Sequence, residues 1–302
     1  MLLLIGAALW ALRGELPNIA TALRDIHPRW SLVALASVIV LATYALLIET
    51  WRRVLGALGS PLGWTNAALI WLGSNLARYL PGTLWQLGVM SMMTRRRGIA
   101  LANAGTSALL IAIVNVYTGI AIWAICSARA PTLGGKGIWF VVLGGVALLV
   151  ASFGMPVLAR VWGRFTGREI VLPRVDVRSV AIAALGTTIG WLAYGVAFWV
   201  LAAAILPDGT RSLDAAIAIY TGSYLAGFLA IIPPAGLGVA EGVMVALGLE
   251  FAFASRVELV TLALVVRLWR TLLEILPGIV AVALEARTAR QTSEPAVRSS
   301  RG

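Results

Sequence analysis

The chain has 302 residues, of which 60% are hydrophobic and only 12% are charged, and its mean hydropathy is +0.91. Soluble domains carry roughly 25% charged residues, so this composition excludes a soluble enzyme, a disordered chain and a fibrous protein. Apolar runs of about 20 residues recur along the chain, and each can cross the roughly 30 Å core of a bilayer as a helix. Because these runs are continuous rather than alternating, a transmembrane β-barrel is also excluded. The sequence predicts an all-α polytopic membrane protein.

The formal net charge is +11, and every basic residue except Lys136 is an arginine. Most of these arginines lie between apolar runs, close to where anionic lipid headgroups would be, so we expect a membrane partner and no nucleic acid. One cysteine, Cys126, and one histidine, His27, provide neither an intrachain disulfide nor a nitrogen–sulfur metal site. We expect no metal, and, because no nucleotide-binding motif is present, no cofactor.

Two of the apolar segments are interrupted. In chain order the segments are 1–12, 31–50, 65–93, 100–126, 138–158, 179–206, 213–250 and 257–284. Pro81-Gly82 breaks the third, and Pro233-Pro234 with the glycines that follow breaks the seventh. Irregular backbone at membrane depth survives only where protein or a polar cavity satisfies its hydrogen bonds. We therefore expect residues 65–94 and 213–250 to form re-entrant hairpins.

The two interrupted segments resemble each other. Ile70–Ala77 matches Ile219–Ala226 with five identities in eight residues at an offset of 149. Beyond the prolines, Leu87-Gly88-Val89 matches Leu237-Gly238-Val239 at an offset of 150. Because this offset is about half of the chain, we interpret the match as an internal duplication. The duplication divides the chain into a first membrane repeat (1–130) and a second membrane repeat (131–285). We expect the basic cytoplasmic tail that follows (286–302) to be disordered.

The basic residues distinguish between two topologies. If both interrupted segments are re-entrant, 14 basic residues lie on one side of the membrane and 7 on the other. Eight plain crossings give at best 12 against 9. The positive-inside rule favours about six transmembrane helices plus two re-entrant hairpins, with eight spans as the alternative. Three crossings per half make the repeat inverted, an arrangement common in transporters that bind substrate at the midplane.

This topology also predicts an orientation in the cell (inner) membrane. Both termini, residues 95–97 and residues 160–178 are expected in the cytoplasm, whereas residues 129–136 and 207–212 are expected outside.

The last apolar segment carries three charges, Arg267, Arg270 and Glu274, on one predicted helical face. Each charge at the bilayer centre costs on the order of 2.5–3.5 kcal/mol, so these side chains must face protein or a wet cavity. Arginine presents a planar fork that suits phosphate. We interpret the three as an anion site, with a structural ion pair between helices as the alternative.

The interrupted segments contribute further candidates for substrate binding. Glu241 follows the second break, where it could pair with an embedded arginine, carry a coupling proton, or be a helix N-terminal acid. Arg78 precedes the first break, and its repeat equivalent is Gly227, so we interpret Arg78 as a substrate contact. Gly236 and Gly238 complete the set, and no residue is assigned a catalytic role.

Two other features predict helix packing rather than function. Gly186-x-x-x-Gly190 permits a close helix–helix approach. Asn115 lies within an apolar segment, where we expect it to hydrogen-bond between helices.

Three motifs resemble the lysylphosphatidylglycerol synthase transmembrane (flippase-like) family. They are Arg78-Tyr-Leu-Pro-Gly82 with Trp85, Pro234-Ala-Gly-Leu-Gly-Val-Ala-Glu-Gly242, and Arg267 with Pro277-Gly278. The resemblance extends from the second span to the last. Ala235 stands where the family usually has glycine, and Ala240 stands where many members have arginine, which leaves no basic residue directly before the glutamate.

The resemblance implies the lipid-moving part of these proteins without their aminoacyl-transferase domain, since only residues 285–302 follow the last segment. We therefore expect a non-enzymatic, non-ATP-driven translocase for an anionic phospholipid or a lipid-linked anionic headgroup. A non-catalytic subunit or scaffold of a larger membrane complex is the alternative, and a homo-oligomer is compatible with either. An intramembrane enzyme acting on lipid phosphates is a third reading.

Overall fold

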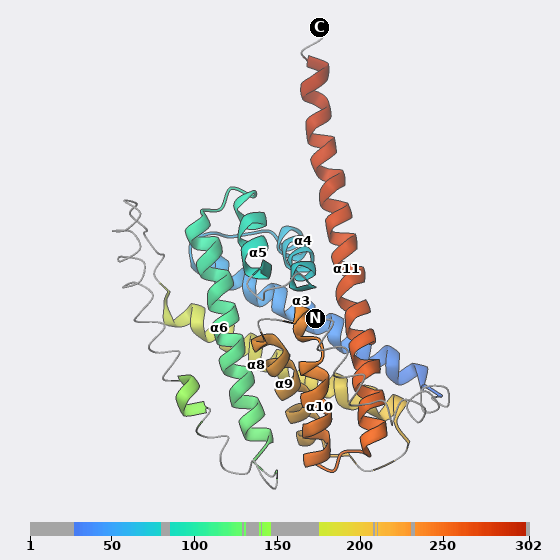
Figure 1. Cartoon of the computed structure of the whole chain (residues 1–302). Coiled ribbons are helices and arrows are strands. Elements are labelled where there is room, and N and C mark those ends of the chain that lie inside the picture. The colour runs from blue at the N-terminus through green and yellow to red at the C-terminus, as the bar shows by residue number, and fades with distance from the viewer. Residues whose placement is uncertain are drawn as a thin grey trace.

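The computed structural model describes residues 27–79, 85–128, 130, 139, 141–145, 175–207, 209, 211–230 and 233–299, and within these ranges it contains helices and no strands (Figure 1). Among the described residues, three helices are long and apolar enough to cross a membrane: α3 (Trp30–Ala57), α6 (Leu101–Cys126) and α8 (Val177–Ile205). The prediction of a helical membrane protein is confirmed, while the number of spans stays a prediction. Segment 1–12 and most of segment 138–158 lie outside the described residues.

Neither interrupted segment is one continuous helix. The first consists of α4 (Trp64–Asn75), the short 3₁₀ helix η1 (Leu76–Tyr79) and α5 (Trp85–Arg95), and the second of α9 (Leu213–Leu229), the 3₁₀ turn η2 (Pro234–Gly236) and α10 (Val239–Glu250). Within each segment the two α-helices pack against each other, and η1 contacts η2. Figure 1 shows the α4–α5 pair in the upper part of the bundle and the α9–α10 pair in the lower part, and η1 and η2 lie where the two pairs meet. Pro81-Gly82 lies outside the described residues.

The helices of the two halves follow in the same order and with similar spacing. In the first half α3, α4, α5 and α6 begin at residues 30, 64, 85 and 101. In the second half α8, α9, α10 and α11 (Arg256–Ser299) begin at residues 177, 213, 239 and 256. Each of the four therefore has a counterpart about half a chain later, which is the order that the predicted duplication requires.

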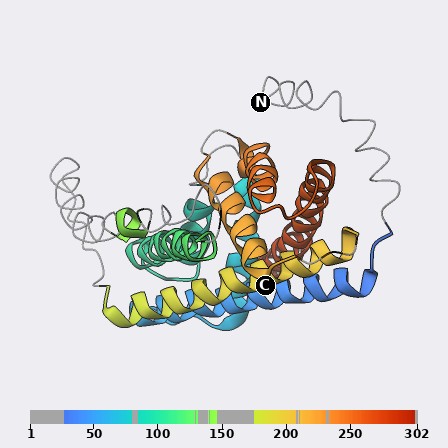
Figure 2. The same ribbon diagram turned by 90° about the horizontal axis from the view of Figure 1, so that it is seen from below.

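The α3 and α8 helices run side by side in opposite directions (Figure 2). A Cβ atom on Gly186 would lie 2.1 Å from the Thr50 hydroxyl oxygen, and one on Gly190 would lie 3.2 Å from the Leu47 side chain. The predicted close approach at these glycines is confirmed. An interhelical hydrogen bond of the Asn115 side chain stays a prediction. The interhelical hydrogen bond at this position runs from the Trp191 indole N–H to the Asn115 backbone carbonyl (2.9 Å).

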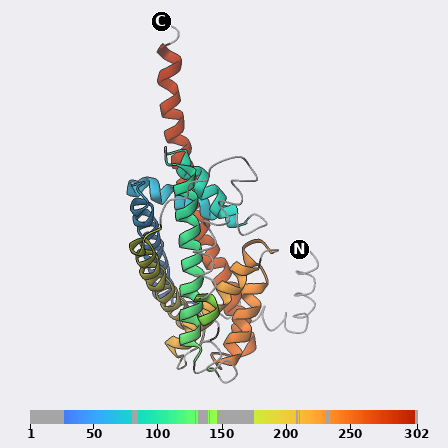
Figure 3. The same cartoon turned by 90° about the vertical axis from the view of Figure 1, so that its left-hand side faces the viewer.

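The longest helix, α11, has 44 residues, and its C-terminal half extends well beyond the other helices (Figures 1 and 3). At 1.5 Å per residue its length is about 66 Å. We expected a disordered tail over residues 286–302; in the structure α11 continues to Ser299, and the disorder of the tail stays a prediction. Alanine and arginine, which favour a helix, supply seven of the 17 residues after Glu285.

The tip of the second hairpin depends on residues in the left-handed region. Gly236 has φ 66°, and a Cβ atom there would lie 2.4 Å from the Gly227 Cα atom of α9. Ala235 has φ 50° and ψ 29°, a conformation that glycine adopts without strain but alanine does not. The position at which this chain departs from the usual glycine is therefore one where the backbone favours glycine.

Substitutions at these two neighbouring positions should have opposite effects on stability. Gly236→Ala should lower the free energy of unfolding by roughly 1–3 kcal/mol, because the left-handed backbone is strained and α9 must move away. Ala235→Gly should raise it by up to about 1 kcal/mol, because it relieves left-handed strain. Thermal unfolding in detergent measures both, and Gly88→Ala is the control, since a Cβ atom at Gly88 meets nothing within 4 Å. If Gly236→Ala and Ala235→Gly changed the free energy of unfolding in the same direction, this description of the tip would be wrong.

The chain segments between helices gather at two ends of the bundle. At the end from which α11 projects, Arg97 pairs with Glu285 (3.1 Å). At the opposite end the Arg29 backbone N–H donates to the Ala204 carbonyl (3.0 Å) and the Arg211 guanidinium lies over the Phe253 ring. The sequence assigns Arg52, Arg53, Arg95, Arg96, Arg97, Arg178 and Arg287 to one side of the membrane and Arg29, Arg211 and Arg256 to the other. This assignment stays a prediction.

The orientation can be tested by labelling single cysteines in a Cys126→Ala background. Arg96 and Ser212 are both exposed and lie at opposite ends. We expect a membrane-impermeant maleimide to label Ser212→Cys in intact cells and Arg96→Cys only after lysis, because the end richer in arginine faces the cytoplasm. Labelling of Arg96→Cys from outside would contradict the topology.

Candidate functional site

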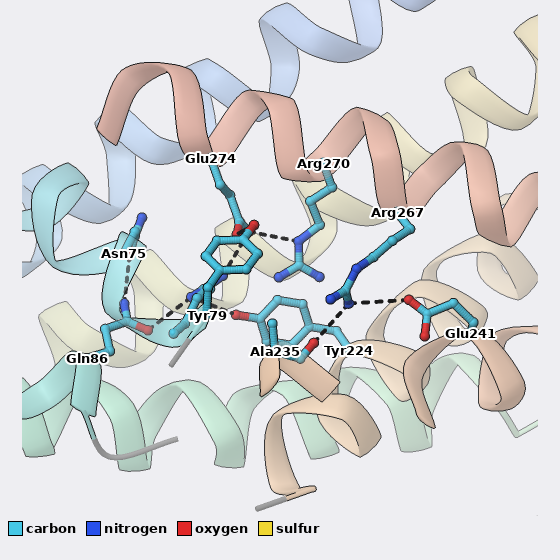
Figure 4. Close-up of polar contacts among 10 residues, drawn as sticks. Asn75, Tyr79, Gln86, Tyr224, Ala235, Glu241, Arg267, Arg270 and Glu274 are labelled. Carbon is cyan, nitrogen blue, oxygen red and sulfur yellow. Dashed lines mark hydrogen bonds and ion pairs between the residues drawn. The ribbon is translucent and has the colours of Figure 1, made fainter. Parts of the chain in front are cut away.

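One face of α11 presents three charged side chains to the hairpin tips. Arg267, Arg270 and Glu274 follow one another along this face and point toward η1, η2 and α10 (Figure 4). The predicted shared face is confirmed. Because α11 packs against α4 and also against α10, it contacts both hairpins.

Glu274 is the centre of the first charged cluster, and only 4% of its side chain is exposed. Its Oε1 atom accepts hydrogen bonds from Arg270 Nε (2.9 Å) and from Arg78 Nη1 (2.8 Å). Its Oε2 atom accepts one from the Tyr79 hydroxyl (2.9 Å). The predicted pair between Arg270 and Glu274 is present, and the same carboxylate also ties α11 to η1.

The two arginines of this cluster have further partners. Arg78 Nη2 donates to the Gln86 side-chain oxygen (3.2 Å) and lies 3.4 Å from the Tyr224 hydroxyl. The Arg270 guanidinium lies 4.3 Å from the centre of the Tyr224 ring, a cation–π contact. Gln86 in turn donates to the Asn75 side-chain oxygen (2.6 Å). Arg78, which we expected to be a substrate contact, is thus also a structural link between η1 and α11, and its contact with substrate stays a prediction.

The second charged cluster joins α11 to the second hairpin. Arg267 Nη1 lies 3.3 Å from Glu241 Oε1 and donates to the Ala235 backbone carbonyl (2.9 Å). Glu241 Oε2 accepts a hydrogen bond from the Gly238 backbone N–H (2.7 Å) at the start of α10. Glu241 therefore pairs with an arginine and caps a helix at the same time, whereas its role as a carrier of a coupling proton stays a prediction.

The two clusters differ in burial and geometry. The Arg267 and Glu241 side chains are 23% and 21% exposed, and their single ionic contact is longer than those of Glu274. Glu274 is nearly inaccessible and makes three short contacts. The contacts of Glu241 are therefore easier to exchange than those of Glu274.

Both clusters line one cavity of about 760 Å³. Its charged lining residues are Arg78, Arg267, Arg270, Glu241 and Glu274, so one positive charge is in excess. An uncompensated charge in a protein interior is unfavourable, and an anion in the cavity would neutralise it. In the part of the chain that the structure describes, no group of three or more His, Cys, Asp or Glu residues could hold a metal ion.

Gly236 and Gly238 affect the site through their backbone, and neither residue lines this cavity. Gly236 allows η2 to approach α9, and Gly238 supplies the N–H group that anchors Glu241. Their assignment to substrate binding stays a prediction.

Sequence reasoning missed four polar partners of the charged residues: Tyr79, Gln86, Tyr224 and Asn75. Two of them had a local signal, because Tyr79 follows Arg78 and Gln86 follows Trp85 within the motif that carries the family resemblance. Tyr224 and Asn75 lie in the duplicated stretches, and nothing in their spacing indicates the contact.

Comparisons with known proteins agree with the motifs. No curated protein matches the chain. A family model described as the lysylphosphatidylglycerol synthase transmembrane region matches residues 1–278, a range that includes both hairpins and all five charged residues of the cavity. The chain therefore belongs to the lysylphosphatidylglycerol synthase transmembrane-region family, and it is a helical membrane protein with a lipid-related role.

Proposed function

We propose that this protein translocates lipids with an anionic headgroup across the cell membrane and that it is not an enzyme. The observation that carries the proposal is the cavity between the hairpin tips, where three guanidinium groups meet two carboxylates. Membership of a lipid-related membrane family supports a lipid as the substrate.

The mechanism follows from the difference between the two clusters. The headgroup enters the cavity where the hairpins meet, and its acyl chains remain in the bilayer. The phosphate displaces Glu241 from Arg267 and accepts two parallel hydrogen bonds from the guanidinium fork. On release, Glu241 pairs with Arg267 again, while Gly238 holds the carboxylate close by throughout.

The chain carries no nucleotide-binding motif, so this movement is passive or coupled to an ion. The arginine-rich end of the bundle faces the cytoplasm in this proposal, and both termini lie on that side.

Reconstitution into liposomes tests the proposal. Acyl-labelled phosphatidic acid should become accessible to an external reductant in vesicles that contain the protein and not in empty vesicles. Labelled diacylglycerol, which crosses bilayers without help, serves as the control for complete reduction of the label. Mass spectrometry of the extracted lipids should show no new species, because no bond is made or broken. A new lipid species, or no protein-dependent movement of any phosphate-bearing lipid, would contradict the proposal.

A further inference from the structure

A second cavity of about 860 Å³ adjoins the first. The two cavities share a wall formed by Arg78, Gln86, Tyr224, Phe228, Arg270 and Glu274. Beyond this wall the second cavity is lined by residues of α3, α4, α5, α6 and α8, so it lies deeper among the helices than the space around Arg267.

Outside the shared wall, the lining of the second cavity is uncharged and combines aromatic, aliphatic and polar side chains. Tyr44, Trp71, Trp191 and Tyr194 contribute rings. Among the described lining residues, the charged ones are those of the shared wall, and there Glu274 is already bound by two guanidiniums and a hydroxyl. The net charge of the wall is positive.

Several polar groups on this lining have no partner among the described residues. They are the side-chain amide of Asn115, the side-chain nitrogen of Asn75 and the hydroxyls of Tyr44 and Tyr194. Each lies on the cavity lining rather than deep within the packing, so an occupant of the cavity can reach it. The cavity therefore offers hydrogen-bond donors and acceptors without offering a counter-charge.

This lining discriminates among possible occupants. An acyl chain would leave the amides and hydroxyls unpaired, at a cost of roughly 1–3 kcal/mol for each group. A cationic headgroup would face Arg78 and Arg270 in a region of low dielectric. An uncharged group that carries hydroxyls can satisfy the amides and tyrosines and can lie against the aromatic rings.

We infer that the second cavity binds the uncharged, hydroxyl-bearing part of the headgroup, a polyol or a sugar, whose phosphate lies in the first cavity at Arg267. This inference rests on the proposed function and names its substrate class. The shared wall places the two sites next to each other, as a polyol joined directly to a phosphate requires.

The test compares two acyl-labelled lipids in proteoliposomes, phosphatidylinositol and phosphatidic acid, which share chains and phosphate and differ in the polyol. Asn115→Leu replaces the amide by an apolar group of similar size. It should lower the translocation rate of phosphatidylinositol about tenfold and change that of phosphatidic acid by no more than about twofold. A tenfold effect corresponds to about 1.4 kcal/mol. Tyr194→Phe should act in the same direction, and it keeps the test valid if Asn115→Leu does not fold. Tyr117→Phe is the matched control, since Tyr117 is on α6 but lines neither cavity.

Different failures have different meanings. If Asn115→Leu lowered the translocation rates of both lipids equally, the assignment of the second cavity alone would be wrong. The same holds if lipids with a cationic headgroup moved faster than phosphatidylinositol. If neither lipid moves, and Arg267→Gln changes nothing, the proposed function itself is wrong.

Discussion

Arg267→Gln should abolish translocation of anionic lipids while the protein still folds and inserts into the membrane. The guanidinium is partly exposed to the cavity, and its ionic contact with Glu241 is a single one at 3.3 Å. Loss of a charge-assisted, bidentate contact with phosphate should lower the initial rate of translocation roughly a hundredfold, which corresponds to about 2.7 kcal/mol. Folding should survive because Glu241 keeps its hydrogen bond from the Gly238 N–H.

Two further variants sharpen this prediction. Arg267→Lys should retain part of the activity, because the charge remains and the planar fork does not. Arg95→Gln is the matched control, since Arg95 is exposed at the end of α5 and lines neither cavity. Suppose instead that Arg267→Gln prevents expression and that Arg267→Gln with Glu241→Gln restores it. The pair would then be structural, and the assignment of Arg267 to phosphate binding would be wrong.

Glu274→Gln should prevent stable folding. The carboxylate is 4% exposed and compensates the guanidiniums of Arg78 and Arg270, whose side chains are 17% and 25% exposed. Removal of one partner from a buried ion pair costs roughly 3–5 kcal/mol, a large part of the 5–15 kcal/mol by which native proteins are stable. Size-exclusion chromatography of the detergent-solubilised protein should show loss of the monodisperse peak. Glu274→Gln combined with Arg78→Gln should recover part of it, because one unpaired guanidinium is removed.

Glu49 provides the matched control for burial. Like Glu274 it pairs with two arginines, Arg52 and Arg53, each at 2.7 Å. Its side chain is 27% exposed, and that of Arg53 is 64% exposed. Exposed ion pairs contribute roughly 0–1 kcal/mol, so Glu49→Gln should shift the unfolding temperature only slightly. Equal effects at Glu49 and Glu274 would show that burial is not what makes Glu274 essential.

The contrast between Arg270 and Arg78 shows how far the sequence could predict the site. The Arg270–Glu274 pair follows from a spacing of four residues on one helix, so periodicity alone predicts it. Arg78 reaches the same carboxylate across 196 residues of sequence. That contact requires η1 to lie beside α11, which depends on how the hairpins pack, so sequence reasoning placed Arg78 with substrate instead.

The sequence by itself determined the properties that depend on composition and local pattern. Continuous apolar runs require membrane helices, prolines and glycines interrupt two of them, and the charges on one face of the last segment must avoid lipid. Only the tertiary structure decided which charges meet. It brought the two hairpin tips together against α11, buried Glu274 between two arginines, and left Arg267 beside a more exposed carboxylate. The physical reason is that the strength of an ion pair depends on burial and on the number of its partners, and neither is encoded in the spacing of residues along the chain.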